Sequence, residues 1–360
     1  DINITRAAFS SIVYNTYAGG INGYATGPLS LINQTLSQGT INYNFSLNYS
    51  NSTSYSWYHY IGGTSGYLNN GASVENSGRV NPINIVSNIS GYSKYSYVYT
   101  GGIAGYMTGS STNRVSVRKS YNRGDINLSV LTNNTYTSSS YSMYSYVYAG
   151  GIAGYSSAYN TISDCYNRGL ITPSLYAQSS YSAAYATNNA YVAGILGFMA
   201  STTSFTLANS YNTANIPATC ATSGNATNNY YSDAVVYNTS AYATANCYHL
   251  ASCCANNAHY SISKTQSELR ALQMIHNLNV GTPGSGIWTS DILPTTNNGY
   301  PIFDATPYGY AIYTRPATDI TGSSASLNGY IDTNFMDISS LDDIGFEYAL
   351  VGDTLYSSVS

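Results

Sequence analysis

The chain has 360 residues and a formal net charge of -4, and only 7% of its residues are charged, against roughly 25% in ordinary soluble domains. Binding to a phosphate backbone depends on clustered Lys and Arg, so nucleic acid is excluded as an expected partner. Solubility must come from neutral polar groups, including 41 Tyr residues that combine a packing ring with a hydroxyl. No apolar run reaches the 18 or so residues of a membrane span, so none is expected.

Five similar units follow one another through the first two thirds of the chain. They begin 43, 39, 49 and 43 residues apart, as YAGGINGY at Tyr17, YIGGTSGY at Tyr60, YTGGIAGY at Tyr99, YAGGIAGY at Tyr148 and YVAGILGF at Tyr191. A second half-motif follows each of them, most clearly YNRGDI from Tyr121 and YNRGLI from Tyr166. Self-similarity at a nearly fixed period predicts a repeat architecture.

Glycines and aromatic residues recur at fixed offsets within the units. Glycine is expected where a side chain would obstruct close backbone approach or a left-handed bend. The glycines are Gly20, Gly23, Gly63, Gly66, Gly102, Gly105, Gly151, Gly154, Gly194 and Gly197. The aromatic residues that flank them should stack one repeat apart and form ladders. These aromatics are Tyr17, Tyr24, Tyr60, Tyr67, Tyr99, Tyr106, Tyr148, Tyr155, Tyr191 and Phe198.

The segments upstream of the anchors alternate with period two, as in Tyr95, Tyr97 and Tyr99, which is typical of a β-strand. We therefore predict an all-β fold in which residues 1–236 form a five-repeat parallel β-solenoid (β-helix). Repeats of this length fit two rungs of about 20 residues each, giving a rod of about 50 Å. A propeller is the main structural alternative, but its four-stranded blades would need more hairpin turns than the sequence shows.

The GGIAGY and YNRG-x-I patterns resemble the GLUG motif, a short repeat of large microbial surface proteins. The resemblance covers roughly residues 10 to 220, and the unit at Tyr60 is its weakest copy because Thr64 replaces the usual Ile and Ser77-Gly78 replaces the Tyr-Asn pair. GLUG-motif proteins share no catalytic apparatus. The resemblance therefore implies an extracellular or cell-surface location and an architecture, and it implies no activity.

Ten N-x-S/T sequons permit N-glycosylation, although a chain rich in Asn, Ser and Thr produces many by chance. They begin at Asn3, Asn33, Asn44, Asn48, Asn51, Asn88, Asn127, Asn133, Asn225 and Asn238.

Four of the five cysteines are clustered, which predicts one or two disulfides in an oxidising compartment and leaves Cys165 free. The clustered cysteines are Cys220, Cys247, Cys253 and Cys254. The residues that could in principle ligate zinc are Cys247, His249, Cys253, Cys254 and His259. Their spacing matches no zinc module that we recognise. We therefore predict no metal site.

Residues 237–310 are predicted to form a capping segment whose helix spans about residues 265–279. Thr265 and Glu268 make a capping box at its start, and Gly281 follows its end. From residue 311 to 360 the sequence resembles the first strands of a fibronectin type III-like or immunoglobulin-like domain. Only about half of such a domain is present, which favours a fragment of a longer chain or completion by a neighbouring molecule.

Catalytic candidates are sparse. Between Ile12 and Pro217 the predicted solenoid contains only Glu75, Asp125 and Asp164 as carboxylates, at non-equivalent offsets, whereas glycoside hydrolysis needs a convergent pair. We predict no catalytic residue, no cofactor and no enzyme, with a polysaccharide-active β-helix enzyme as a minor alternative.

Two non-enzymatic functions remain. The first is an extracellular structural protein that self-associates into a surface fibre or filament. The second is a cell-surface adhesin that binds glycans or host surfaces through exposed Tyr and Trp57.

Overall fold

In a computed structural model the chain divides into two compact units, Asp1–Gln266 and Ser267–Ser360. The structure describes the chain except for residues 8–12, 50–54, 92–93, 136–140, 202–203, 239–243, 254–258, 281–286, 292–296, 304–311, 319–320, 322–325, 332–345, 349–356 and 360. Asn51 and Cys254 therefore lie outside the described residues.

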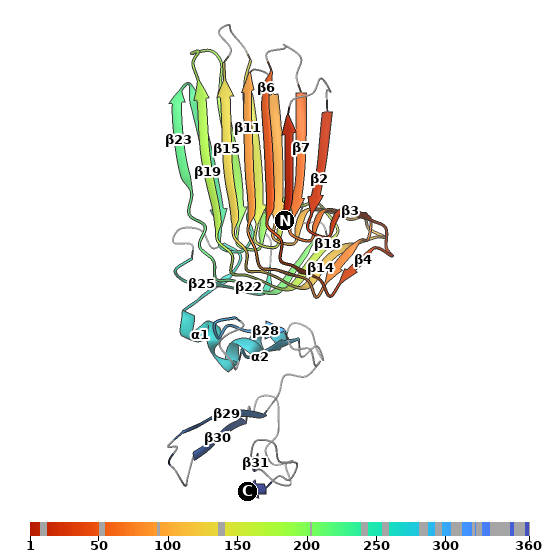
Figure 1. Cartoon of the computed structure of the whole chain (residues 1–360), viewed down its shortest axis with the longest axis vertical. Helices are drawn as coiled ribbons and strands as arrows, with labels where there is room; N and C mark the ends of the chain where they lie inside the picture. Colours follow the sequence, from red (N-terminus) through yellow and green to blue (C-terminus); the bar gives the residue numbers. More distant parts are fainter. Residues whose placement is uncertain are drawn as a thin grey trace. The chain divides into compact units, whose positions relative to one another are not determined.

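The first unit is a parallel β-solenoid built from four sheets, in which strands of successive repeats lie side by side (Figure 1). Sheet A contains β1 (Ile2–Ala7), β6 (Ile41–Tyr49), β11 (Ile83–Gly91), β15 (Ile126–Asn134), β19 (Ile171–Ser179) and β23 (Thr219–Gly224). Sheet B contains β2 (Val13–Gly19), β7 (Tyr55–Gly62), β12 (Lys94–Gly101), β16 (Met143–Gly150), β20 (Ala186–Ala193) and β24 (Ala226–Asp233).

The other two sheets are made of shorter strands. Sheet C contains β3 (Asn22–Thr26), β8 (Ser65–Asn69), β13 (Ala104–Thr108), β17 (Ala153–Ser156) and β21 (Leu196–Met199). Sheet D contains β4 (Leu31–Asn33), β5 (Leu36–Ser37), β9 (Ser73–Glu75), β10 (Gly78–Arg79), β14 (Val115–Asn122), β18 (Asn160–Asn167), β22 (Thr206–Asn212), β25 (Ala245–Leu250) and β26 (Ile262–Lys264). The predicted all-β parallel architecture is confirmed.

Each repeat forms one rung, which we define as one turn of the chain through the four sheets. Tyr60 pairs with Tyr17 on one side and with Tyr99 on the other, each a whole repeat away. The prediction of two rungs per repeat is therefore wrong. The two half-motifs lie in different parts of the same turn, because the glycine motif joins sheets B and C whereas the Tyr-Asn motif lies in sheet D. At about 4.8 Å per rung, the solenoid is about half as long as predicted.

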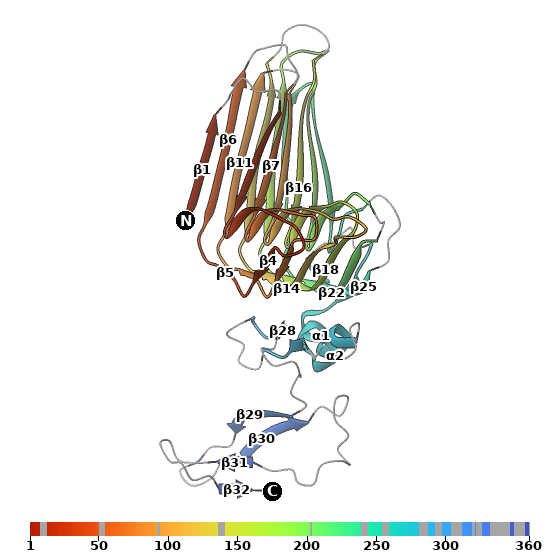
Figure 2. The same ribbon diagram turned by 90° about the vertical axis from the view of Figure 1, so that its right-hand side faces the viewer.

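The apolar core has two lobes. Inward-facing residues of the long strands in sheets A and B, such as Ile83, Leu128 and Val147, form one cluster. Residues of sheets C and D, such as Met107 and Ile162, form the other. The longer strands of sheets A and B extend well beyond the compact layer formed by sheets C and D (Figure 2). Strict burial alternation along β11 and β15 leaves a row of outward polar side chains on sheet A.

Sheet D contains a column of residues in the left-handed region, one in each rung, with φ between 45° and 54°. They are Gln34, Asn76, Lys119, Asp164, Asn209 and Asn246. Asn and Asp tolerate this conformation better than most residues because their side chains can form local hydrogen bonds. The irregularity shifts the alternation within β14, so that Val117, Ser120 and Asn122 all face the core.

The second unit contains α1 (Gln266–Arg270), α2 (Leu272–Val280), β27 (Trp288–Thr289) and β28 (Ile302–Phe303), followed by β29 (Ile312–Thr318), β30 (Ser326–Ile331), β31 (Phe346–Tyr348) and β32 (Ser357–Val359). The predicted helix is thus present as two short helices. They separate at Ala271, whose N–H donates to the carbonyl of Glu268, only three residues back. The strands after β28 form two antiparallel pairs, and a complete sandwich stays a prediction. No helix among the described residues is long and apolar enough to cross a membrane.

Candidate functional site

Two columns of aromatic rings run along the solenoid where sheet B meets sheet C. In sheet B, neighbouring rings stack at centroid distances of 5.0 to 5.3 Å, in the order Tyr17, Tyr60, Tyr99, Tyr148, Tyr191 and Tyr231. The second column follows the order Tyr24, Tyr67, Tyr106, Tyr155, Phe198 and Tyr237. We call these two columns the aromatic corner. In-register parallel pairing places identical residues one rung apart, which is what allows the rings to stack.

The two columns also contact each other edge to face within each of the first five rungs. Tyr99 and Tyr106, for example, lie 5.1 Å apart with an interplanar angle of 87°. Each interior ring therefore has both faces covered by rings of the same column, and Tyr99 is only 7% exposed. The aromatic corner is consequently a packed structural element, and its interior ring faces are closed to ligands.

Burial and, to a smaller extent, neighbouring phenols raise the pKa of interior tyrosines of the aromatic corner, such as Tyr60, Tyr67 and Tyr99. Burial is the larger cause, and it raises the pKa of Tyr67 to about 12 and those of Tyr60 and Tyr99 further still. A group whose folded-state pKa is raised stabilises the fold fully below its unfolded pKa, near 10, and loses that contribution as the pH rises. The contribution of these tyrosines should therefore be constant up to about pH 9.5, and urea unfolding at increasing pH should show a steep loss of stability between about pH 10 and 12. A phenolate absorbance titration of the folded protein that matched free tyrosine would contradict this.

The repeat glycines are required for close approach rather than for a left-handed bend. None of the ten has a positive φ. A Cβ on Gly105 would lie 2.5 Å from the carbonyl oxygen of Gly66, one rung away, and 2.6 Å from the backbone nitrogen of Ile61. The Ile between the paired glycines faces the core in the interior rungs, as at Ile103, whereas its counterpart Ile21 in the first rung is 51% exposed.

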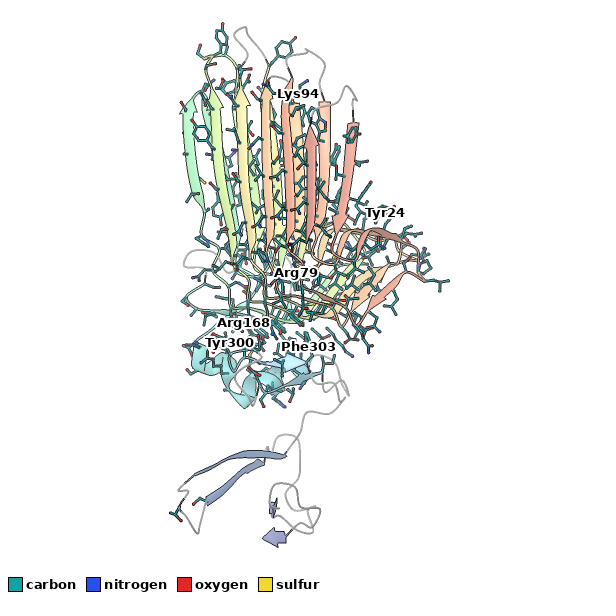
Figure 3. The ribbon with its side chains drawn as sticks, in the orientation of Figure 1. Tyr24, Arg79, Lys94, Arg168, Tyr300 and Phe303 are labelled. Atoms are coloured by element: carbon teal, nitrogen blue, oxygen red, sulfur yellow. The ribbon has the colours of Figure 1, made fainter. Side chains whose placement is uncertain are left out.

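A ladder of fully buried asparagines packs against the same glycines. The Nδ2 of Asn122 donates to Oδ1 of Asn167 at 2.9 Å, and the Nδ2 of Asn167 donates to Oδ1 of Asn212 at 2.9 Å. A Cβ on Gly151 would lie 2.2 Å from Cγ of Asn167. The Tyr-Asn half-motif and the glycine pair are therefore two halves of one packing arrangement. In the weakest repeat, Arg79, which is labelled in Figure 3, takes the asparagine position.

Of the cysteines predicted to form one or two disulfides, Cys220 and Cys247 do not pair with each other. Both carry free thiols, because Cys220 lies on β23 in sheet A and Cys247 on β25 in sheet D. Cys253 is buried and accepts a hydrogen bond from Nδ2 of Asn212 at 3.6 Å. Cys165 is a buried free thiol within the core, as predicted.

Thiol labelling of the native protein should separate these cysteines by exposure. Cys220 is exposed, whereas burial raises the pKa of Cys165 well above its usual range and that of Cys247 to about 12. Iodoacetamide should therefore alkylate Cys220 in the folded state and reach the other two only after denaturation. Protection of Cys220 that is lost on adding reductant would instead reveal a disulfide.

The candidate catalytic and metal-ligating residues do not converge. Glu75 lies 3.8 Å from Nζ of Lys119, Asp125 accepts a hydrogen bond from the N–H of Leu170, and Asp164 is buried within β18. Within the described residues, no three His, Cys, Asp or Glu side chains lie close enough to hold a metal ion. His249 and His259 bond to Ser261 and Asp233 respectively.

Six of the predicted sequons, at Asn3, Asn44, Asn48, Asn88, Asn127 and Asn133, lie on strands of sheet A. Strand alternation explains this grouping, because an N-x-S/T triplet puts Asn and Ser or Thr on the same outward face with an inward residue between them. Three others lie elsewhere: Asn33 on β4, Asn225 in the turn before β24, and Asn238 after it. Asn44 and Asn48 are exposed, whereas Asn127 is half-buried and hydrogen-bonded.

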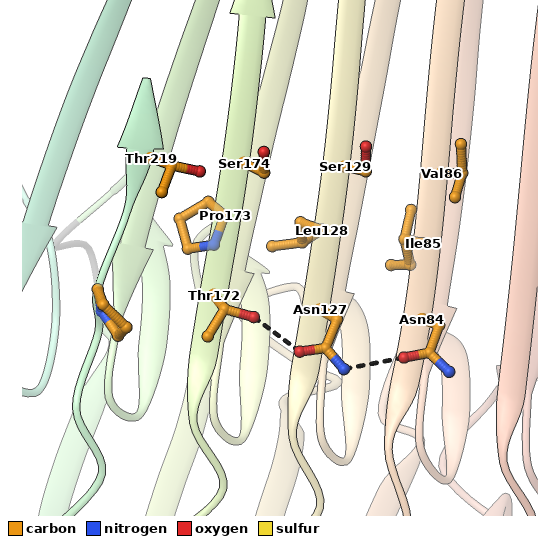
Figure 4. Close-up of a pocket in the computed structure, with 11 residues that line it drawn as sticks. Asn84, Ile85, Val86, Asn127, Leu128, Ser129, Thr172, Pro173, Ser174 and Thr219 are labelled. Carbon is orange, nitrogen blue, oxygen red and sulfur yellow. Dashed lines mark hydrogen bonds between the residues drawn. The ribbon is translucent and has the colours of Figure 1, made fainter. Parts of the chain in front are cut away.

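The outer face of sheet A contains a groove of about 550 Å³ that crosses β11, β15 and β19 (Figure 4). Its floor includes a second, outward ladder. Thr172 Oγ1 donates to Oδ1 of Asn127 at 2.7 Å, and Nδ2 of Asn127 donates to Oδ1 of Asn84 at 2.9 Å. The sequence prediction missed this groove. The available signal was an Ile-Asn or Ile-Thr pair recurring as Ile41-Asn42, Ile83-Asn84, Ile126-Asn127 and Ile171-Thr172.

No family model, curated protein or solved structure matches this chain. The resemblance to GLUG-motif proteins therefore stays a prediction that depends on the repeated residues alone.

Proposed function

We propose that this chain is a non-enzymatic, extracellular structural protein that self-associates into a surface fibre or filament. The observation that carries the proposal is the set of continuous side-chain ladders, aromatic and amide, that bind each rung to the next. Such ladders make a solenoid whose stability is approximately a sum of contacts between neighbouring rungs. Where the exposed sequons at Asn44 and Asn48 are occupied, glycans would project from sheet A outside the groove.

The exposed edge of the first described rung supports self-association. Among the described strands, β1, β2 and β3 each have a paired neighbour on one side only. The same rung carries exposed large apolar side chains, namely Tyr17, Ile21, Tyr24, Leu29, Leu31 and Leu36. Unpaired strand edges with exposed apolar residues are a template for pairing with another chain.

The last rung offers a matching surface. In sheet B, Tyr231 is stacked on Tyr191, and Nδ2 of Asn229 donates to Oδ1 of Asn189 at 2.9 Å. By register, the equivalent positions of the first rung are Tyr17 and Asn15. If the last rung of one copy stacked on the first rung of a second copy, Tyr231 would lie beside Tyr17 and Asn229 beside Asn15. Each of these two positions would then have the same residue type on both sides of the junction.

Electron microscopy of the purified protein over a range of concentrations tests this proposal. Filaments should form as the concentration rises, and Ile21→Lys should abolish them by placing a charge on the first rung. Tyr185→Lys is the matched control, because Tyr185 is 50% exposed and Ile21 is 51% exposed. Isolated particles at every concentration would contradict the proposal.

The adhesin alternative loses Trp57, one of its expected binding residues. Trp57 was predicted to be exposed, and this is wrong, because it is 3% exposed and packs on Phe45 in the core between sheets A and B. Ring faces in the interior of the aromatic corner are likewise covered. Within the aromatic corner, stacking of sugars on ring faces is therefore restricted to the rings at the two ends of the columns.

A further inference from the structure

We propose that the groove on the outer face of sheet A is a binding site for a neutral polysaccharide chain. This inference goes beyond the structural role proposed above and does not depend on it. It uses a face of the molecule that lacks the tyrosine columns and lies on a different sheet from the aromatic corner.

The lining of the groove is entirely uncharged. Its outward side chains come from three successive rungs and the start of the next, and they are Asn84, Val86, Asn127, Ser129, Thr172, Ser174, Pro217 and Thr219. No Lys, Arg, Asp, Glu or His takes part. An anionic or cationic ligand would lose its hydration there without gaining an opposite charge, so the groove favours a neutral ligand.

The amide ladder holds its polar groups in fixed orientations. Each amide nitrogen has two hydrogens and each amide oxygen has two lone pairs. Each hydrogen bond of the ladder from Thr172 through Asn127 to Asn84 uses one donor hydrogen and one acceptor lone pair. Asn84 continues the ladder by donating to Oδ1 of Asn42 at 2.8 Å. The remaining hydrogens and lone pairs are available to a ligand. Because they are already ordered, binding costs little side-chain entropy.

The repeat of the groove matches a repeating ligand. One amide or hydroxyl recurs at every rung, about every 4.8 Å, so the ligand should lie across the strands and parallel to the solenoid axis. Val86 and Pro217 add apolar surface to the lining of the groove. Sugar rings present hydroxyl groups at their edges and C–H groups on their faces, and both kinds of surface are accommodated.

A peptide fits less well than a polysaccharide. Strands β11, β15 and β19 have paired neighbours on both sides, so their backbone groups are already hydrogen-bonded within the sheet. A peptide could therefore not bind by adding a strand, which is the mode that gives extended peptides their affinity for sheets. A chain that offers its own hydroxyl groups does not need free backbone groups on the protein.

Affinity electrophoresis of the full chain through gels containing a soluble neutral polysaccharide tests the proposal. The probes are a β-glucan, a mannan and an α-glucan, with polygalacturonate as the anionic comparison. At least one neutral polymer should retard the wild-type protein. Asn127→Leu should weaken that retardation at least about tenfold, since it removes the middle of the polar row at a cost of about 1.4 kcal/mol or more.

Asn44→Leu provides the matched control, because Asn44 is an outward asparagine of sheet A that does not line the groove. It should bind as the wild type does, and urea unfolding should show that both variants fold. The proposal is overturned if no neutral polymer retards the protein, if polygalacturonate is preferred, or if Asn127→Leu binds like Asn44→Leu. Filament formation is scored separately, so either proposal can fail alone.

Discussion

Replacing Gly151 by alanine should lower the free energy of unfolding by about 3 kcal/mol or more, or prevent folding altogether. The added Cβ would lie 2.2 Å from the carbonyl oxygen of Gly194 in the next rung and 2.2 Å from Cγ of Asn167. Neither neighbour can move away easily, because the first is backbone and the second is fixed in the buried amide ladder. Overpacking a rigid interior commonly costs about 1 to 3 kcal/mol, and a clash with backbone belongs at the upper end.

Gly39→Ala is the matched control for this substitution. Gly39 also lacks a positive φ, and its added Cβ would lie 3.2 Å from the nearest atom, the backbone nitrogen of Asp1. It should change stability by less than about 1 kcal/mol. Urea unfolding followed by circular dichroism measures both variants. Equal stability of the two would contradict the close-approach explanation of the repeat glycines.

Replacing Asn167 by alanine should cost about 3 kcal/mol. The substitution removes the acceptor for Nδ2 of Asn122 and the donor to Oδ1 of Asn212, and all three side chains are fully buried. Each of these two groups keeps one other partner, since Nδ2 of Asn122 also donates to the carbonyl of Gly124 and Oδ1 of Asn212 also accepts from the N–H of Ala214. The loss of one buried hydrogen bond on either side should therefore cost about 1 kcal/mol each. Loss of the side chain also leaves a void beside Gly151.

The outward ladder supplies the control, since Asn84 makes the same kind of amide contacts on the surface of sheet A. Water can replace the lost partners there, so Asn84→Ala should cost about 0.5 kcal/mol. Chemical unfolding of both variants at neutral pH makes the comparison. A smaller loss for Asn167→Ala than for Asn84→Ala would show that the buried ladder does not stabilise the solenoid.

Much of the solenoid could be predicted because its pattern is local. Alternation in segments such as residues 95–99 indicates a strand directly, and the glycine positions indicate close approach. In-register stacking of Tyr99 on Tyr60 and Tyr148 follows from their equal place in the repeat. The strands, the close approaches and the ring stacking each depend only on the type of a residue and on its position within the repeat.

The size of the rung could not be predicted from the same pattern. Two half-motifs about 20 residues apart can be two similar rungs or two different corners of one rung, and only the pairing of strands distinguishes these. The left-handed residues Lys119 and Asp164 gave no signal, because neither is a glycine. The groove on sheet A was missed because its residues Asn84, Asn127 and Thr172 come together only across rungs.

Engineered disulfide formation tests most directly the claim that one repeat makes one rung. Tyr97 and Tyr146 are paired outward residues on β12 and β16, whereas Asn189 lies one rung further along, beside Tyr146. In-register neighbours have Cα atoms about 4.8 Å apart, within disulfide range, and residues two rungs apart exceed it. In a Cys220→Ser background, Tyr97→Cys with Tyr146→Cys should therefore oxidise to a disulfide detected by intact mass, and Tyr97→Cys with Asn189→Cys should not. Two rungs per repeat would separate both pairs too far, so failure of the first pair to form a disulfide would contradict the structure described above.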